Sequence, residues 1–152
     1  MLDIELPAPD AVVRSVLSAR GIVPALAFLN DRTSYRFTAI YKLNGEVMRA
    51  AHVFDRTLEY RAWLKVVPLE KSFCQHAIEH GEFFTNHASE DRRLTNRPYA
   101  GFVESYYGRL LRRTDGKPYG TFIHFDLEPQ RIARSEIAFL RQVIPTFLDY
   151  LD

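Results

Sequence analysis

The chain has 152 residues, 47% of them hydrophobic and 26% charged, which suits one globular domain with its own core. Twenty basic and nineteen acidic residues leave a formal net charge of +1, so neither a nucleic acid nor an anionic membrane surface is an expected partner. No apolar run approaches the roughly 20 residues of a membrane-spanning helix, and the acidic start of the chain lacks the features of a signal peptide.

The N-terminal part of the chain predicts two helices. Residues 1–9 contain two prolines and are expected to form a loose arm of a single domain that spans residues 1–152. Valines and a leucine recur at helical spacing over residues 12–17, and Asp10 is the expected N-cap of this helix. A proline in the first turn suits a second helix that starts near Pro24 and ends at Asn30-Asp31.

The period then changes to that of a β-hairpin. Apolar and polar residues alternate over residues 35–42, and residues 47–54 form the second expected strand. Asn44-Gly45 lies between them, and such a pair supplies the positive φ angles of a two-residue hairpin turn. Residues 55–65 are ambiguous, with a short helix carrying Trp63 as one interpretation.

The middle of the chain reads as short elements. A short strand is expected at residues 66–69, and Ser72 is the expected cap of a helix that runs to about His80 and ends at Gly81. Residues 82–86 are predicted to be extended, and residues 87–98 form a polar loop.

The last part predicts a second hairpin and a helix. Strands are expected at residues 103–112 and 118–126, because Asp115-Gly116 between them marks a turn. An apolar stripe at helical spacing runs from Ile137 to Leu151, and Pro145 should kink this helix. Antiparallel strands with helices at both chain ends predict an α+β domain, with one sheet and helices on its faces.

An ordered set of short motifs resembles the GAF domain family. The motifs are Val67-Pro68-Leu69, Ser72-Phe73-Cys74, Gly81, Asp91-Arg92-Arg93-Leu94, Val103-Glu104-Ser105-Tyr106-Tyr107-Gly108-Arg109-Leu110-Leu111, Asp115-Gly116-Lys117-Pro118-Tyr119-Gly120-Thr121 and Phe125-Asp126-Leu127-Glu128-Pro129. The similarity covers about residues 21–152, although Leu110 stands where the family often has proline. It implies a PAS-related central antiparallel sheet of about six strands, with terminal helices on one face and a cavity roofed by short helices and loops on the other.

The resemblance also implies a function, namely a non-catalytic, cytoplasmic sensor module that binds a small molecule and acts in signalling as a dimer. No cofactor is expected. The apolar stripes of the terminal helices permit a homodimer, and they equally permit these helices to cover the sheet within one subunit. A structural dimerisation module whose cavity is filled by its own side chains is a further alternative.

Strand alternation and the resemblance together predict the ligand-binding residues. Thr121, Ile123 and Phe125 share one face of their strand, and the resemblance places Tyr106 and Gly108 on one face of the neighbouring strand. Segments expected to roof the cavity add further aromatic side chains. The expected ligand-binding residues are Trp63, Phe73, His76, Tyr99, Phe102, Tyr106, Thr121, Ile123 and Phe125. An aromatic pocket with a few polar tips suits a modest, partly apolar ligand.

Cys74 is the chain's only cysteine, which excludes an internal disulfide and favours a reducing, cytoplasmic location. Free methionine-R-sulfoxide reductase resembles this fold but uses several cysteines, so recycling of a lone thiol would require an external thiol. No catalytic residue is therefore expected, and a divergent reductase that uses Cys74 is the alternative. Burial in the core is the simpler interpretation of this cysteine.

The histidines do not predict a metal site. His76 and His80 share one face of the expected helix, which is a common start for zinc, but the sequence places no third ligand. His124 lies on the opposite side of its strand from Ile123, so we expect a hydrogen-bonded histidine on the side of the helical layer.

Overall fold

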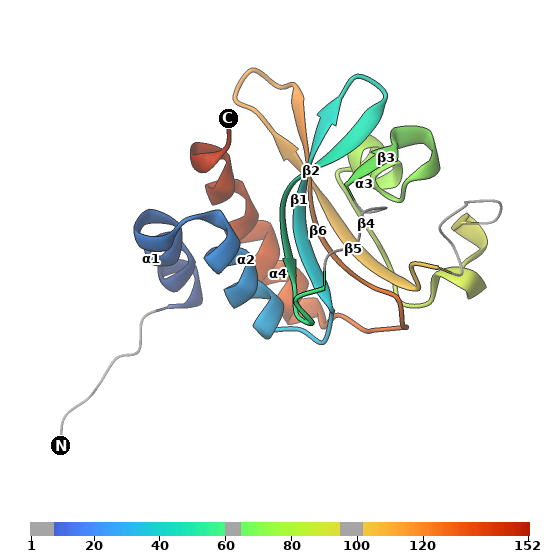
Figure 1. Cartoon of the computed structure of the whole chain (residues 1–152), viewed down its shortest axis with the longest axis horizontal. Coiled ribbons are helices and arrows are strands. Elements are labelled where there is room, and N and C mark those ends of the chain that lie inside the picture. The colour runs from blue at the N-terminus through green and yellow to red at the C-terminus, as the bar shows by residue number, and fades with distance from the viewer. Residues whose placement is uncertain (1–7, 60–64, 95–101) are drawn as a thin grey trace.

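Six strands form one antiparallel sheet in the order β3-β2-β1-β6-β5-β4 (Figure 1). The strands are β1 (Phe37–Asn44), β2 (Val47–Asp55), β3 (Val66–Pro68), β4 (Glu82–Thr85), β5 (Ser105–Arg112) and β6 (Pro118–Asp126). Strands β1 and β6, distant in sequence, therefore pair in the middle of the sheet. The computed structural model describes residues 8–59, 65–94 and 102–152, and within them it confirms the expected α+β class.

Helices cover both faces of this sheet (Figure 1). One face carries α1 (Pro9–Arg20), α2 (Ile22–Asp31), α4 (Arg134–Val143) and the 3₁₀ helix Ile144–Tyr150. The other face carries α3 (Cys74–His80) and the short 3₁₀ turns Leu69–Lys71, Ala88–Glu90 and Arg92–Leu94. None of the helices in the described ranges is both long and apolar enough to cross a membrane.

Strand alternation divides the interior into two cores. On β6, Phe122 packs among the helices of the first face, whereas Ile123 and Phe125 face α3. On β5, Tyr107 and Tyr106 divide in the same way. The alternation that the sequence predicted for β6 is therefore confirmed, because successive side chains of a strand point to opposite faces.

Two predicted helix caps are wrong. Helix α1 begins at Pro9 after Ala8, so Pro9 belongs to the helix rather than to an arm, and Asp10 lies within the first turn without capping it. Proline suits this position because a first-turn N–H has no partner within the helix. The Ser72 hydroxyl donates to the Leu69 carbonyl at 3.0 Å, closing a local turn instead of capping α3. Residues 1–7 of the predicted arm (residues 1–9) lie outside the described residues.

The first hairpin turn is displaced by one residue from its prediction. Asn44 pairs with Val47, so the two loop residues are Gly45 and Glu46. Gly45 has φ +64°, and it is the loop's only residue in the left-handed region, so the asparagine stays in the strand. Gly81, with φ +86°, ends α3 as predicted. The helix predicted to carry Trp63 falls largely on residues 60–64, outside the described part.

Pro145 acts as predicted. Helix α4 ends at Val143, and the chain continues as the 3₁₀ helix Ile144–Tyr150. Proline has no N–H to donate to the carbonyl four residues earlier, so the α-helical pattern stops there. The terminal segment still packs on the sheet through Phe147, which is fully buried.

Candidate functional site

A small cavity of about 50 Å³ lies between the sheet and α3. Its lining residues are Tyr41, Met48, Val67, Ser72, Phe73, Cys74, Val103, Tyr106, Ile123 and Phe125. Most of these side chains are apolar and nearly all are buried. In outline this is the chamber expected under the roof of the sheet, but it is small.

Several aromatic side chains pack against one another on this face. Phe37 stacks on Phe125 with ring centroids 4.6 Å apart, and the two belong to the paired strands β1 and β6. Phe73, just before α3, meets Tyr106 edge to face at 5.5 Å. Such pairs hold rings in defined orientations, so the cavity is what remains between ordered rings.

The Cys74 thiol, which lines the cavity, lies among hydroxyl groups. The Tyr106 hydroxyl donates to the Cys74 sulfur at 3.2 Å, and the Thr121 hydroxyl donates to the same sulfur at 3.3 Å. A thiol sulfur is a weak hydrogen-bond acceptor. An oxygen atom in its place would therefore be a better acceptor for either hydroxyl group.

Burial sets the protonation of this cluster. Removal from water raises the pKa of the Cys74 thiol, and the hydroxyls of Thr121, Tyr106 and Ser72 only partly oppose the effect. Burial and the neighbouring sulfur raise the pKa of the Tyr106 phenol well above its ordinary value. Both groups are therefore neutral at physiological pH, whereas a nucleophilic cysteine requires the thiolate.

Four of the predicted ligand-binding residues line the cavity, namely Phe73, Tyr106, Ile123 and Phe125. Thr121 stands behind this wall and reaches it through Cys74. Their contact with a ligand remains a prediction.

Two predicted roof residues do not line the cavity. His76 stacks on Phe83 at 4.6 Å, because its position on α3 turns it toward β4 rather than toward the centre of the sheet. Phe102 is 47% exposed. Trp63 and Tyr99 lie outside the described residues.

Six cavity residues were not predicted: Tyr41, Met48, Val67, Ser72, Cys74 and Val103. Alternation on β1 was a usable signal, because Tyr41 shares a face with Phe37. Met48 and Val67 meet through the pairing of β2 with β3, which no local pattern reveals.

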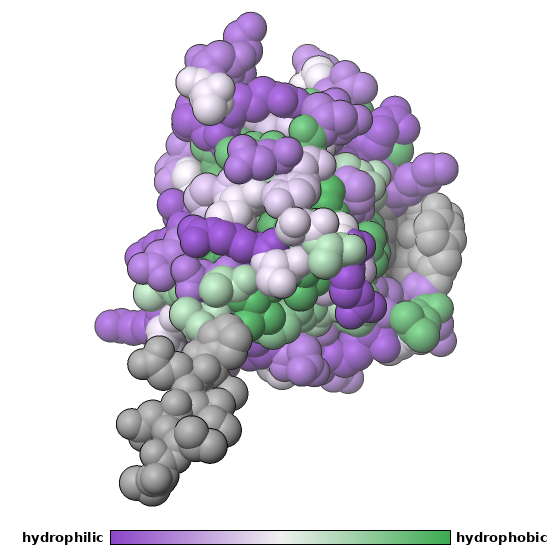
Figure 2. Space-filling view, turned by 90° about the vertical axis from the view of Figure 1, so that its left-hand side faces the viewer, coloured by the Kyte–Doolittle hydropathy of each residue, from purple (hydrophilic) through white to green (hydrophobic). Residues whose placement is uncertain are grey.

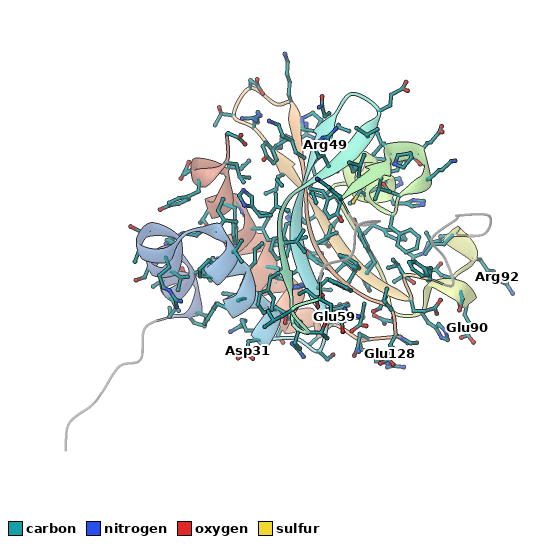
Figure 3. The ribbon with its side chains drawn as sticks, in the orientation of Figure 1. Asp31, Arg49, Glu59, Glu90, Arg92 and Glu128 are labelled. Atoms are coloured by element: carbon teal, nitrogen blue, oxygen red, sulfur yellow. The ribbon has the colours of Figure 1, made fainter. Side chains whose placement is uncertain are left out.

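Among the residues that the structure describes, no charged side chain lines this cavity. Figure 3 shows Glu90 and Arg92 at the edge of the molecule, Arg49 is exposed, and none of the three is among the lining residues. The part of the wall that the structure describes therefore offers no full charge to a ligand.

The opposite core contains a buried polar network. The Thr38 hydroxyl lies 2.6 Å from His124 Nδ1, and the Asn30 amide donates to that hydroxyl at 2.9 Å. Tyr35 stacks parallel to the His124 ring. Burial, followed by the charge of Arg56, lowers the pKa of His124 to about 3. This confirms the prediction of a hydrogen-bonded histidine on the helical side, away from the cavity.

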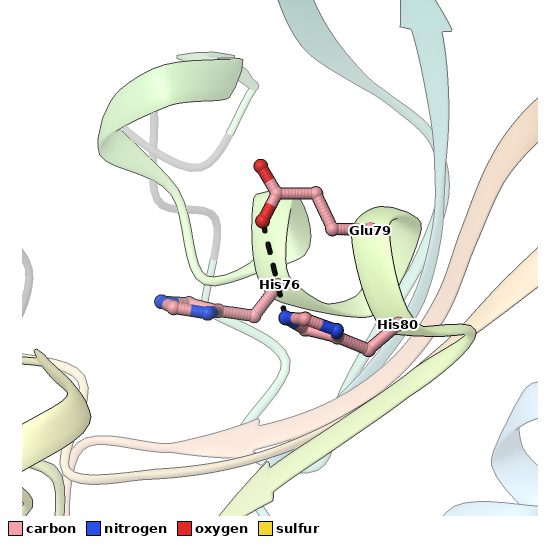
Figure 4. Close-up of side chains that lie close together, drawn as sticks. All are labelled: His76, Glu79 and His80. Carbon is pink, nitrogen blue, oxygen red and sulfur yellow. Dashed lines mark ion pairs between the residues drawn. The ribbon is translucent and has the colours of Figure 1, made fainter.

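The C-terminal turn of α3 brings together three potential metal ligands, His76, Glu79 and His80 (Figure 4). One donor atom of each lies within 4.8 Å of the others. Glu79 is the third group that sequence analysis did not find.

No protein-family model matches this chain, and no curated protein is significantly similar to it in sequence. Solved structures do match. The GAF domain of an Acinetobacter phosphoenolpyruvate-protein phosphotransferase superposes with a TM-score of 0.73 at 10% identity, covering 93% of this chain and 89% of that one. A free methionine-R-sulfoxide reductase from Neisseria meningitidis, in complex with its substrate, gives 0.68 at 11% identity, covering 99% and 96%.

The chromophore-binding domain of a bacteriophytochrome from R. palustris is also similar, with a TM-score of 0.66 at 11% identity over 93% of this chain and 60% of that one. Similarity at sequence identities this low shows a shared fold and nothing more. The expected fold is thereby confirmed, and the chain has the GAF fold.

Proposed function

We propose that this GAF-fold domain binds a small molecule with an apolar body and one hydrogen-bond-accepting oxygen in the cavity beneath α3. The observation that carries the proposal is the Tyr106 hydroxyl, which lies in an otherwise largely apolar wall and donates to the weakly accepting sulfur of Cys74. A carbonyl or ether oxygen accepts better than sulfur. A ligand oxygen would therefore replace Cys74 as the partner of Tyr106.

The size of the cavity restricts the ligand. A volume of about 50 Å³ has room for a few water-sized groups. A larger molecule requires Phe73 and the start of α3 to move away from the sheet. The lining residues in the described ranges carry no charge, which favours a neutral ligand, because burying an unpaired charge is costly.

The proposal is tested by a thermal-shift screen of small ketones, esters and amides against hydrocarbons of matched size. A ligand at 100 times its dissociation constant adds about 2.7 kcal/mol to stability. The Tyr106→Phe variant should lose the preference for the oxygen-bearing compounds while still binding hydrocarbons. Tyr107→Phe is the matched control, because Tyr107 belongs to the opposite core.

Stabilisation by none of these compounds would favour the alternative of a structural module whose cavity its own side chains fill. An unchanged preference in Tyr106→Phe would refute the role given to the phenol. Both outcomes are read from the same melting curves.

We further propose that the domain is a cytoplasmic sensor that signals as a homodimer through its terminal helices. The outer surface of the helical layer, seen in Figure 2, mixes apolar with polar residues. Val23 on α2 and Tyr150 near the C-terminus are 40% and 45% exposed. Analytical ultracentrifugation with and without ligand tests the idea, and a monomer under both conditions would contradict it.

A thiol-dependent reductase is the second candidate, because the Cys74 sulfur forms part of the cavity wall and a reductase shares the fold. The raised thiol pKa disfavours it. The discriminating assay is NADPH-coupled reduction of free methionine-R-sulfoxide with an external thiol system. Turnover that disappears in Cys74→Ser would establish the enzyme, and no turnover in either protein would leave the binding module.

A further inference from the structure

The part of α3 from His76 to His80 carries two imidazoles and one carboxylate. His76, Glu79 and His80 occupy positions i, i+3 and i+4 of a helix with 3.6 residues per turn. Glu79 and His80 therefore lie one turn beyond His76, roughly 60° to one side of it and 40° to the other. In Figure 4 the three side chains project from the same region of the helix.

One of these ligands is held in place and two are adjustable. The His76 ring stacks on Phe83 at 4.6 Å with an interplanar angle of 22°, and Phe83 is a buried residue of β4. The side chains of His80 and Glu79 are 66% and 54% exposed, and their closest nitrogen–oxygen distance is 4.0 Å. No tight pairing between these two has to be broken before they turn toward a common point.

The distances are within reach of a bound ion. Zinc bonds of about 2.0–2.2 Å in a tetrahedral arrangement place donor atoms roughly 3.3–3.5 Å apart. The three donors now lie within 4.8 Å of one another. Binding would require the two exposed side chains to rotate about their own bonds to close this difference, while the His76 ring stays on Phe83.

We propose that His76, Glu79 and His80 form a binding site for a divalent first-row transition ion, of which Zn²⁺ is the test case. Two imidazole nitrogens and one carboxylate oxygen suit zinc and its neighbours, whereas Mg²⁺ and Ca²⁺ prefer all-oxygen sites. The fourth position is left to water. All three ligands belong to α3 (Cys74–His80), so the ion would link successive turns of the helix that roofs the cavity. The proposal does not depend on what the cavity binds.

The test is titration of the untagged, chelator-treated and desalted protein with ZnCl₂ by isothermal calorimetry. We expect one Zn²⁺ per chain with a dissociation constant below about 0.1 mM. His80→Ala should weaken binding by at least about 10-fold, and Glu79→Gln should weaken it by a smaller factor. Both side chains are mostly exposed, so the variants should fold, which circular dichroism verifies.

His87→Ala is the matched control. The His87 ring lies 3.1 Å from carboxylate oxygens of both Glu90 and Glu104. Among the described residues, this is another imidazole close to carboxylates that could bind zinc instead. Binding that survives His87→Ala but not His80→Ala supports the proposal. The opposite pattern overturns it, as does the absence of zinc binding or equal competition by Mg²⁺.

Discussion

The phenol ring of Tyr106 lies over Gly108, two residues further along β5, in the space that a side chain at Gly108 would occupy. A β-carbon there would stand 2.6 Å from the Tyr106 ring atoms Cε1 and Cζ. The glycine thus lets the ring lie along its own strand, where its hydroxyl reaches Cys74. The geometry of the cavity wall depends on this one missing side chain.

Replacement of Gly108 by alanine should displace Tyr106 and reduce the free energy of unfolding by about 1–3 kcal/mol, a typical cost of overpacking. Urea unfolding measures the loss. In a Tyr106→Leu background the Gly108→Ala substitution should reduce the free energy of unfolding by less, because leucine lacks the end of the ring that the new methyl group would contact. Equal costs in both backgrounds would show that another contact is responsible.

Cys74 should react slowly with an aromatic disulfide reagent in the folded protein. The residue is only 4% exposed, so the reagent reaches the sulfur poorly. Burial also raises the pKa of the thiol, so little of the reactive thiolate is present. We expect the rate at pH 8 to be at least about 100-fold below the rate in denaturing urea. Absorbance of the released thiolate reports the reaction. A native rate close to the unfolded rate would mean that the roof opens readily.

Thr38→Val should destabilise the protein by about 1–3 kcal/mol. The substitution keeps the shape of the side chain but leaves His124 Nδ1 and one Asn30 amide proton buried without their hydroxyl partner. Thr57→Val is the control, because the Thr57 hydroxyl contacts Asp55 at an exposed position and should change stability by no more than about 0.5 kcal/mol. Similar losses of stability in the two variants would show that the buried hydrogen bonds of Thr38 do not stabilise the protein.

Stability should fall as the pH falls from about 6.5 toward 5. Burial lowers the pKa of His124 to about 3 in the folded state, against an unfolded value of about 6.5. In this window His124 becomes protonated in the unfolded chain but stays neutral in the folded chain. The free energy of unfolding therefore falls by up to about 1.4 kcal/mol for each unit by which the pH falls. Urea midpoints at pH 7, 6 and 5 measure the slope.

Two controls isolate this effect. Burial also lowers the pKa of His52, so the same series in His52→Gln should retain most of the slope. The carboxyls with lowered pKa, Asp55, Glu82 and Asp91, lose their contribution only at lower pH, near and below their unfolded values of about 4. A His124 imidazole that NMR shows to be protonated at pH 5 would contradict the prediction.

The sequence predicted much of the fold because its strongest signals are local. Alternation identified β6 and placed Ile123 and Phe125 together on one face, and Gly81 marked the end of α3. The two caps, at Asp10 and Ser72, were assigned to the wrong residues. In these places Pro9 and the Leu69 carbonyl offered competing local solutions that residue type alone does not rank.

The sequence by itself determined the class of the domain, the faces of its main strands and four of the residues that line the cavity. Only the tertiary structure decided that Cys74 lies against Tyr106 and Thr121, 32 and 47 residues away, and that His76 turns to Phe83 instead of the cavity. The physical reason is that backbone geometry fixes the side to which a residue points. Its neighbours on that side depend on strand order, register and the packing of α3 across the sheet.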